Sequence, residues 1–290
     1  MASLRDIRRR IRSTRNMAQI TKAMELVAAS RMRRAQANVI AARPYSTAIR
    51  TLITQLGAAR RDGEALHPLL QQRPVQSVGL VMLTSDRGLA GALNTNVIRA
   101  GTEFLLRQEH PVRLVTVGRK GQDFMTRRGR ELRATFTQLG DRPDYMAITP
   151  IARVIMDDYA RGEIDAAYVV YPRFVSTLSQ RPQLDQLLPI AAPAGEEPAG
   201  PAVDYIFEPN PRAILDALLP RYVEVQIYQA VLETIASEQS ARMVAMRSAN
   251  DNATELINSL TLTYNQARQA VITREVLEIA SAAEAMAQGE

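Results

Sequence analysis

The sequence predicts an α/β domain combined with a long coiled coil that is built from the two ends of the chain. Both terminal segments repeat apolar residues at heptad spacing, and predicted strands alternate with helices between them. Residues 221–288 contain neither proline nor glycine. This last run is far longer than the roughly 8–20 residues of an ordinary globular helix.

The N-terminal segment is predicted to be helical from Ser3 to about Leu56. Residues spaced three and four apart form one stripe on a helix face, and nine of its twelve members are apolar. Pro44 lacks a backbone N–H and clashes with the preceding turn, so we expect a kink or an interruption near Arg43. The stripe comprises Leu4, Ile7, Ile11, Thr14, Ala18, Thr21, Glu25, Ala28, Met32, Ala35, Val39 and Ala42.

The middle of the chain has an alternating pattern of strands and helices, which predicts a mainly parallel sheet. Four runs are typical of buried strands, namely residues 75–85, 112–118, 131–137 and 165–172. The intervening residues 89–108, 119–129 and 145–162 are predicted helices, and residues 181–190 are a candidate last strand. The Pro/Gly/Ala-rich run at 191–203 is predicted to be a loop that returns the chain to the C-terminal helix.

The C-terminal segment carries the stronger helical pattern, because fourteen of seventeen stripe positions are apolar. At about 1.5 Å per residue, the helix from Arg221 onward is about 100 Å long, and the N-terminal helix covers only about half of it. We therefore expect the end of this helix to project, alone or into a partner. Pro220 predicts a kink or a delayed helix start. The stripe comprises Leu215, Leu218, Tyr222, Val225, Gln229, Leu232, Ala236, Gln239, Met243, Met246, Asn250, Ala253, Ile257, Leu260, Tyr264, Ala267 and Val271.

The net charge of +6 is unevenly distributed along the chain. Residues 1–36 hold ten basic and two acidic residues, whereas residues 212–290 hold six basic and ten acidic residues. Two helices of opposite charge that lie side by side attract one another. We therefore expect the basic first helix to pair with the acidic last helix.

The composition argues against several classes of catalytic and metal site. The chain has no cysteine, which excludes disulfides, thiolate metal sites and thiol nucleophiles. Only two histidines, His67 and His110, are present, which argues against a histidine metal cluster or a Ser-His triad. The acidic pairs Asp157–Asp158 and Glu196–Glu197 have no accompanying base, so we interpret them as surface charges. No apolar run reaches the roughly 18–20 residues of a membrane span. We expect no catalytic residue, metal ion or cofactor.

The stretch TSDRGLAGALN (84–94) follows a predicted strand and opens a helix, where phosphate-binding loops occur. It matches neither G-x-G-x-x-G nor a P-loop, because only Gly88 and Gly91 are present. A second interpretation is a tight turn whose glycines allow positive φ and a close approach of helix and strand. A third is that Arg87, exposed on this loop, contacts a partner protein.

Four stretches resemble the gamma subunit of the rotary, proton-driven (F-type) ATP synthase of bacteria. They are ITKAMELVAASRMRRAQ (20–36), TSDRGLAGALN (84–94), DYIFEPNP (204–211), and SEQSARMVAMRSANDNATELI with YNQARQAVIT (237–273). The resemblance covers essentially the whole chain. It implies an antiparallel coiled coil of residues 1–56 and 209–290 that forms a shaft, and a central, mainly parallel, Rossmann-like α/β domain at residues 57–208.

The resemblance also implies a function and a set of partners. The shaft lies inside a ring of alternating alpha and beta subunits, and the α/β domain lies near the epsilon subunit and the membrane c-ring. The chain couples c-ring rotation to ATP synthesis without bond chemistry of its own, as a peripheral protein at the cytoplasmic face of the inner membrane. The implied beta-subunit contacts are Met24, Arg87, Arg242, Arg268, Gln269 and Thr273, and the implied c-ring contacts are Tyr205 and Glu208.

The sequence departs from the family pattern in its lack of thiols. The family often has cysteine in the glycine loop where this chain has Ala90, and the cysteine-bearing regulatory insertion of chloroplast members is absent. We therefore expect no thiol regulation. Two alternative functions stay open at this point, namely a nucleotide-dependent α/β enzyme with coiled-coil arms and a basic coiled-coil protein that binds nucleic acid. The arginine-rich N-terminus suits the second, although no aromatic residues interleave with it for base stacking.

Overall fold

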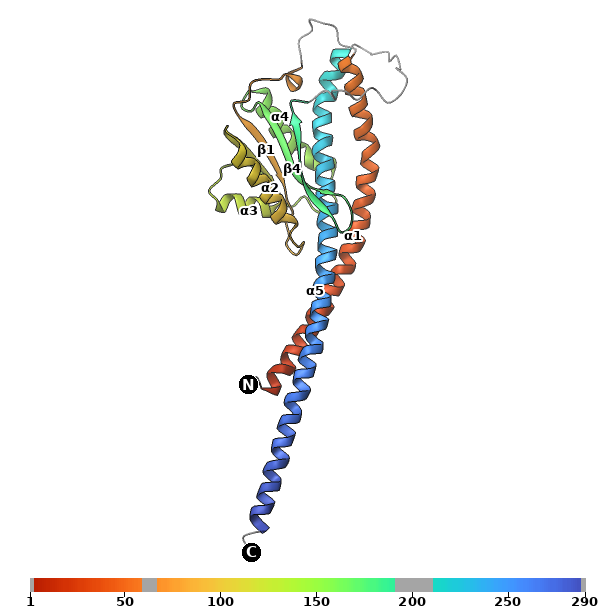
Figure 1. Cartoon of the computed structure of the whole chain (residues 1–290). Helices are drawn as coiled ribbons and strands as arrows, with labels where there is room; N and C mark the ends of the chain where they lie inside the picture. Colours follow the sequence, from red (N-terminus) through yellow and green to blue (C-terminus); the bar gives the residue numbers. More distant parts are fainter. Residues whose placement is uncertain (1–2, 59–66, 191–210, 288–290) are drawn as a thin grey trace. The chain divides into compact units, whose positions relative to one another are not determined.

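The computed structural model describes residues 3–58, 67–190 and 211–287 (Figure 1). The chain divides into two compact units, which we call the helical unit (Met1–Val27 with Met243–Glu290) and the sheet unit (Ala28–Arg242). Both terminal helices, α1 (Leu4–Ala58) and α5 (Pro211–Ala287), contribute to both units. The predicted domain boundaries at residues 56 and 208 stay a prediction, because the boundaries between these two units lie within the long helices.

The sheet unit alternates strands and helices in the predicted order. Every predicted strand and helix between residues 75 and 190 is present, including the candidate last strand. The elements are β1 (Val78–Leu83), α2 (Leu93–Arg107), β2 (Val112–Val117), α3 (Arg119–Arg127), β3 (Leu132–Phe136), α4 (Tyr145–Ala160), β4 (Ala166–Phe174) and β5 (Gln180–Leu188), with a 3-10 turn at Pro68–Leu70 before β1. The predicted loop at 191–203 lies outside the described residues.

The five strands form one sheet in the order β3-β2-β1-β4-β5. The β1–β2, β1–β4 and β2–β3 pairs are parallel, and only β4–β5 is antiparallel. Strand β1 is buried at all six positions, as expected of a central strand that is covered on both faces. The prediction of a mainly parallel sheet is confirmed.

Two apolar cores lie on the opposite faces of this sheet. On one face, β1 residues Leu80 and Met82 join residues of α2 and α3 in one cluster. On the other face, Val81 and Leu83 join residues of α4 and of the α1 and α5 segments in the sheet unit. Since successive side chains of a strand point to opposite faces, this alternation shows that the sheet is sandwiched between helices.

The predicted stripe of α1 is confirmed along its whole length. All twelve positions are buried or half-buried, and Ile7, Ala28 and Val39 are each at most 5% exposed. In the helical unit, Arg8 contacts Tyr264 and Glu25 contacts Arg247, so α1 and α5 run antiparallel there. The heptad pattern therefore identified the face along which the two helices pack.

The stripe of α5 is confirmed from Leu215 to Ala267, where every position is buried or half-buried, but Val271 is exposed. The packed stripe thus ends before Val271, where α1 no longer supplies a neighbour in the helical unit. Within the sheet unit, no side chain from Leu219 to Arg242 is exposed, because this segment packs both on the sheet and on α1. The apolar stripe predicted for α5 covers only one helix face, so it did not predict that residues 219–242 are buried on all sides.

Buried polar side chains attach α5 to the β4–β5 hairpin. The Ser237 hydroxyl donates to the Pro172 carbonyl at 2.8 Å, and the Ser240 hydroxyl donates to the Thr177 carbonyl at 2.6 Å. Both serines are 0% exposed. These bonds satisfy polar groups that would otherwise be costly to bury, and they fix the position of α5 along the hairpin.

The two prolines do not divide the helices as expected. Helix α1 is continuous through Pro44 to Ala58, so an interruption near Arg43 is wrong. Helix α5 begins at Pro211 and continues through Pro220, so a delayed start at Pro220 is also wrong. Each internal proline removes one backbone hydrogen bond, and the core contacts of Val39 and Ile49 around Pro44, and of Leu219 and Val223 around Pro220, oppose that cost.

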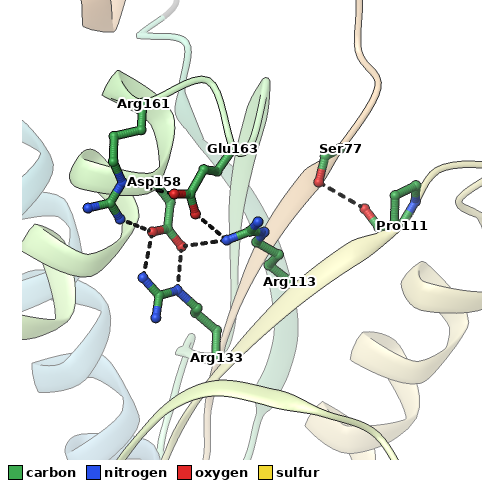
Figure 2. Close-up of polar contacts among 7 residues, drawn as sticks. All are labelled: Ser77, Pro111, Arg113, Arg133, Asp158, Arg161 and Glu163. Atoms are coloured by element: carbon green, nitrogen blue, oxygen red, sulfur yellow. Dashed lines mark hydrogen bonds and ion pairs between the residues drawn. The ribbon is translucent and has the colours of Figure 1, made fainter.

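A cluster of five charged residues joins α4 to two strands (Figure 2). Asp158, only 1% exposed, receives two hydrogen bonds of 3.0 Å from Arg133 and one of 2.7 Å from Arg161. Arg113 approaches Asp158 at 3.9 Å and also pairs with Glu163. The interpretation of Asp158 as a surface charge is therefore wrong, because Asp158 is buried and two of its three arginine partners come from β2 and β3, which are distant in the sequence.

Arg133 reaches Asp158 from an irregular position in the sheet. Along β2, Leu114 pairs with Leu132 but Val115 pairs with Ala134, so Arg133 is the extra residue of a β-bulge. Bulges redirect side chains and increase local twist. This bulge accompanies the two-pronged contact of Arg133 with Asp158.

Candidate partner-binding surface

Among the residues that the structure describes, none covers the end of α5. In the helical unit the Arg8 guanidinium lies 5.4 Å from the centre of the Tyr264 ring. Every side chain described from Arg268 to Ala282 is exposed. The helix itself continues to Ala287, so about 30 Å of helix extends past the last packed residue, Ala267. The expectation that this helix projects is confirmed within the helical unit (Figure 1).

This exposed segment carries apolar side chains that water alone would solvate poorly. Ile272 is 50% exposed, Val276 58% and Ile279 71%, and these residues recur at the spacing of one helix face. Val271 and Leu277 are also exposed. Because contiguous exposed apolar side chains mark interaction sites, this face is a candidate surface for a partner.

Three of the predicted partner contacts lie on the same segment. Arg268, Gln269 and Thr273 are all exposed, and Gln269 and Thr273 are one helical turn apart. Among the described residues, none makes a hydrogen bond or ion pair with these three side chains. Their polar groups are therefore free to bind another chain.

Met24 belongs to a second stripe that the sequence analysis missed. This methionine is half-buried on α1, and Met17, Ile20 and Val27 on the same helix are 52–55% exposed. With Met24 they repeat at spacings of three, four and three residues. The signal was present in the sequence as a second apolar series beside the packed stripe. It adds an exposed apolar face to the helical unit.

Glu25 forms the charged contact between α1 and α5 in the helical unit. Its carboxylate, 6% exposed, lies 3.0 Å from the Lys22 amine and 3.1 Å from the Arg247 guanidinium. Hydrogen bonding from Lys22, with help from Arg247, outweighs burial and lowers the pKa of Glu25. We expected basic residues of α1 to pair with acidic residues of α5. In the Glu25–Arg247 pair the acid is on α1 and the base is on α5, so the signs are reversed.

The loop between β1 and α2 contains Arg87 and the two glycines. Arg87 is exposed, as expected for a partner contact. Gly91 has a φ of +56°, which supports the tight-turn interpretation, but the second residue at positive φ is Leu89, not Gly88. The start of the loop packs closely on Gly118, which follows β2 and has a φ of +88°. A Cβ atom at position 118 would lie only 2.0 Å from the Thr84 carbonyl oxygen, so only glycine fits there.

The space beside this loop is too small for a nucleotide. A cavity of about 40 Å³ lies among the carboxyl ends of β1 and β2, and α5 closes it with residues that include Ile235 and Glu238. Pockets for ligands of that size measure roughly 300–1,000 Å³. The Glu238 carboxyl group also lines this cavity, where its oxygens would oppose a phosphate. The nucleotide-binding interpretation of this loop is therefore not supported.

Arg242 lies beneath the loop and not on the surface. It is 7% exposed, and its guanidinium donates 2.6 Å to the Glu238 carboxylate and 3.2 Å to the Gly88 carbonyl. The other two predicted contacts, Tyr205 and Glu208, lie outside the described residues. The structure thus gathers Arg87 and Arg242 at one loop and gathers Arg268, Gln269 and Thr273 on one helix.

The described residues show neither a membrane span nor a metal site. Among them, no helix is both long and apolar enough to cross a bilayer. In the same part of the chain, no group of three or more His, Cys, Asp or Glu side chains is arranged to hold a metal ion.

Comparison with known proteins identifies the family. The family model described as ATP synthase matches residues 3–286. The "ATP synthase gamma chain" of Dehalococcoides mccartyi strain CBDB1 is 53% identical over 287 residues, covering 99% of this chain and 100% of that protein. The chain belongs to the ATP synthase gamma-chain family. The gamma chain of Roseiflexus castenholzii is 52% identical over 292 residues, with the same coverage.

Solved structures agree with this family at the level of the fold. A chain from the Euglena gracilis mitochondrial ATP synthase (OSCP/F1/c-ring, rotational state 3) has a TM-score of 0.68 at 22% identity, with 99% of this chain and 95% of that chain covered. A chain of the rotor from the same organism has a TM-score of 0.64 at 21% identity, with 93% and 98% covered. The family resemblance that the sequence motifs indicated is confirmed.

Proposed function

We propose that the chain is the central rotor-stalk (gamma) subunit of a bacterial F-type ATP synthase. The observation that carries this function is the end of α5, where residues 268–282 are exposed on all sides and include an apolar face. A helix end of this kind needs a hollow that other chains supply. A ring of alternating alpha and beta subunits supplies such a hollow, and the c-ring and epsilon subunit are the partners at the α/β domain.

The role of the chain in this complex is to carry torque and not to catalyse bond chemistry. An asymmetric helix that turns inside three near-equivalent catalytic sites presents a different face to each of them. Contacts that differ in free energy between conformations shift the populations of those sites, which is how a partner biases their nucleotide affinities. In this chain, Gln269 and Thr273 lie on the same side of the helix as Ile272, Val276 and Ile279, whereas the charged residues Arg274 and Glu278 lie on the opposite side.

The same proposal assigns the remaining contacts and the location. Arg87, Arg268, Gln269, Thr273 and Met24 contact beta subunits, and the residues of the c-ring foot are Tyr205 and Glu208. The complex holds the chain as a peripheral protein at the cytoplasmic face of the inner membrane. The arginine-rich start of α1 has no interleaved aromatic residues for base stacking, and the cavity of about 40 Å³ opposes a nucleotide site at the loop between β1 and α2.

Co-purification with the catalytic subunits tests the proposal. A tagged chain expressed with alpha and beta subunits is expected to elute with three copies of each per copy of the tagged chain. Equilibrium dialysis of the isolated chain with ATP is expected to show no tight stoichiometric site. Elution of the chain alone, or a tight one-to-one nucleotide site, would reject the stalk function.

A further inference from the structure

The loop between β1 and α2 presents a strained, exposed leucine. Leu89 has a φ of +64° and is 60% exposed. Residues other than glycine, asparagine and aspartate seldom adopt this conformation, because the Cβ atom crowds the following carbonyl group. Such a conformation persists only where surrounding contacts enforce it, and it is found more often at binding sites.

Hydrogen bonds anchor the first part of this loop to the sheet unit. The Asp86 carboxylate accepts from the Arg119 amide at 3.0 Å and from the Gln138 amide at 2.9 Å. The Ser85 hydroxyl donates 2.7 Å to the Arg87 carbonyl. We call Gly88 and Leu89 the crest of the loop. After the crest, Ala90 is only 2% exposed, so its side chain is packed inside the sheet unit.

Arg242 supplies the hydrogen bond that holds the crest of the loop. The guanidinium donates 3.2 Å to the Gly88 carbonyl, and among the described residues no other hydrogen bond reaches Gly88 or Leu89. Glu238 holds the guanidinium in place at 2.6 Å from the adjacent turn of α5. Because the Arg242 side chain is 9% exposed, it is not available to a partner and acts through the loop that it binds.

Two exposed side chains flank the Gly88 carbonyl, namely Arg87 and Leu89. Among the described residues, the Arg87 guanidinium has no hydrogen-bond or ion-pair partner. An apolar side chain beside an unpaired cation is complementary to an apolar pocket that has a carboxylate at its rim.

We propose that Arg242 is a positioning residue, which holds the crest of the loop so that Leu89 enters such a pocket on a beta subunit while Arg87 meets its acidic rim. This inference rests on the proposed stalk function. It adds Leu89 as a contact residue, and it assigns Arg242 an indirect role in place of a direct contact.

Amide hydrogen exchange in the isolated full chain tests the positioning role. Arg242→Ala is expected to speed exchange across residues 86–90 by about ten- to a hundredfold, the factor for losing one hydrogen bond to a charged group. Arg242→Lys keeps the charge and a nitrogen donor but not the planar guanidinium that places it, so its effect is expected to be smaller. Arg107→Ala, an exposed arginine on α2, is the matched control. Unchanged exchange in Arg242→Lys, and in Arg242→Ala if it folds, would overturn the positioning role.

A double-mutant cycle in binding to the alpha–beta ring tests the contact. Leu89→Ala and Arg242→Lys are each expected to weaken binding about tenfold, whereas the double variant is expected to be little weaker than either, because both act through one contact. Leu106→Ala, which removes a leucine that is 72% exposed on α2, is the control. Additive effects, or no effect of Leu89→Ala, would overturn the proposal. If the wild-type chain does not bind the ring, the stalk function fails, while the exchange experiment still decides the role of Arg242.

Discussion

Arg268→Ala and Gln269→Ala are expected to lower ATP-driven proton pumping by the assembled enzyme about tenfold or more, while the chain still folds. Truncation of a central interface arginine often costs at least about 2 kcal/mol of binding free energy. Both side chains are exposed in the helical unit, so their removal should change the free energy of unfolding by at most about 0.5 kcal/mol. Proton pumping in inverted vesicles and thermal unfolding of the isolated chain measure the two quantities.

Two neighbouring positions provide matched controls for this pair. Arg274→Ala and Gln266→Ala remove the same side-chain types from exposed positions on the same helix. They are expected to leave proton pumping within about twofold of wild type, as is usual for interface residues outside the hot spots. Wild-type pumping in both Arg268→Ala and Gln269→Ala would remove these residues from the coupling surface.

Asp158→Asn is expected to reduce the free energy of unfolding at pH 7 by about 2 kcal/mol. Removing one partner from a buried ion pair costs roughly 3–5 kcal/mol, and the cost is smaller here because the arginines, 40–51% exposed, can regain water. Denaturant unfolding measures the difference. Asp157→Asn, the exposed neighbour on α4, is expected to change stability by less than about 0.5 kcal/mol.

The effect of Asp158→Asn should also depend on pH. Burial by itself raises the pKa of Asp158, but hydrogen bonds from Arg133 and Arg161 and the charge of Arg113 hold it below its ordinary value. A carboxyl group whose pKa is lowered by folding stabilises the protein above its unfolded pKa of about 3.9, and this stabilisation is lost as the pH falls through the folded pKa. The gap between wild type and Asp158→Asn should therefore narrow below about pH 4. A gap that is constant from pH 7 to pH 3 would contradict this account.

The sequence predicted the features that depend on local periodicity. The packed stripe of α1 and the strands and helices of the sheet unit follow from spacing alone, because burial on one face imposes a repeat on the sequence. The interruption expected at Pro44 and the delayed helix start expected at Pro220 were wrong for the opposite reason. Their local preference is real, but neighbours such as Val39 and Leu219 are buried in the tertiary core, and that packing overrides the preference.

The candidate site was predictable only in part. Arg268, Gln269 and Thr273 lie on an exposed helix, as the motif resemblance implied. The burial of Arg242 beneath the loop at Gly88 was not visible in the sequence, because it depends on how α5 meets the carboxyl edge of the sheet. The same holds for the burial of Asp158, because two of its three arginine partners come from strands β2 and β3.

Direct observation of rotation tests the central claim. Since the chain has no cysteine, Glu109→Cys introduces a single thiol for a probe in the connection between α2 and β2. With the alpha–beta ring fixed to a surface and ATP supplied, the probe is expected to turn in one direction and pause three times per turn, as a ring of three catalytic sites requires. A probe that stays fixed while the complex hydrolyses ATP would contradict the stalk function.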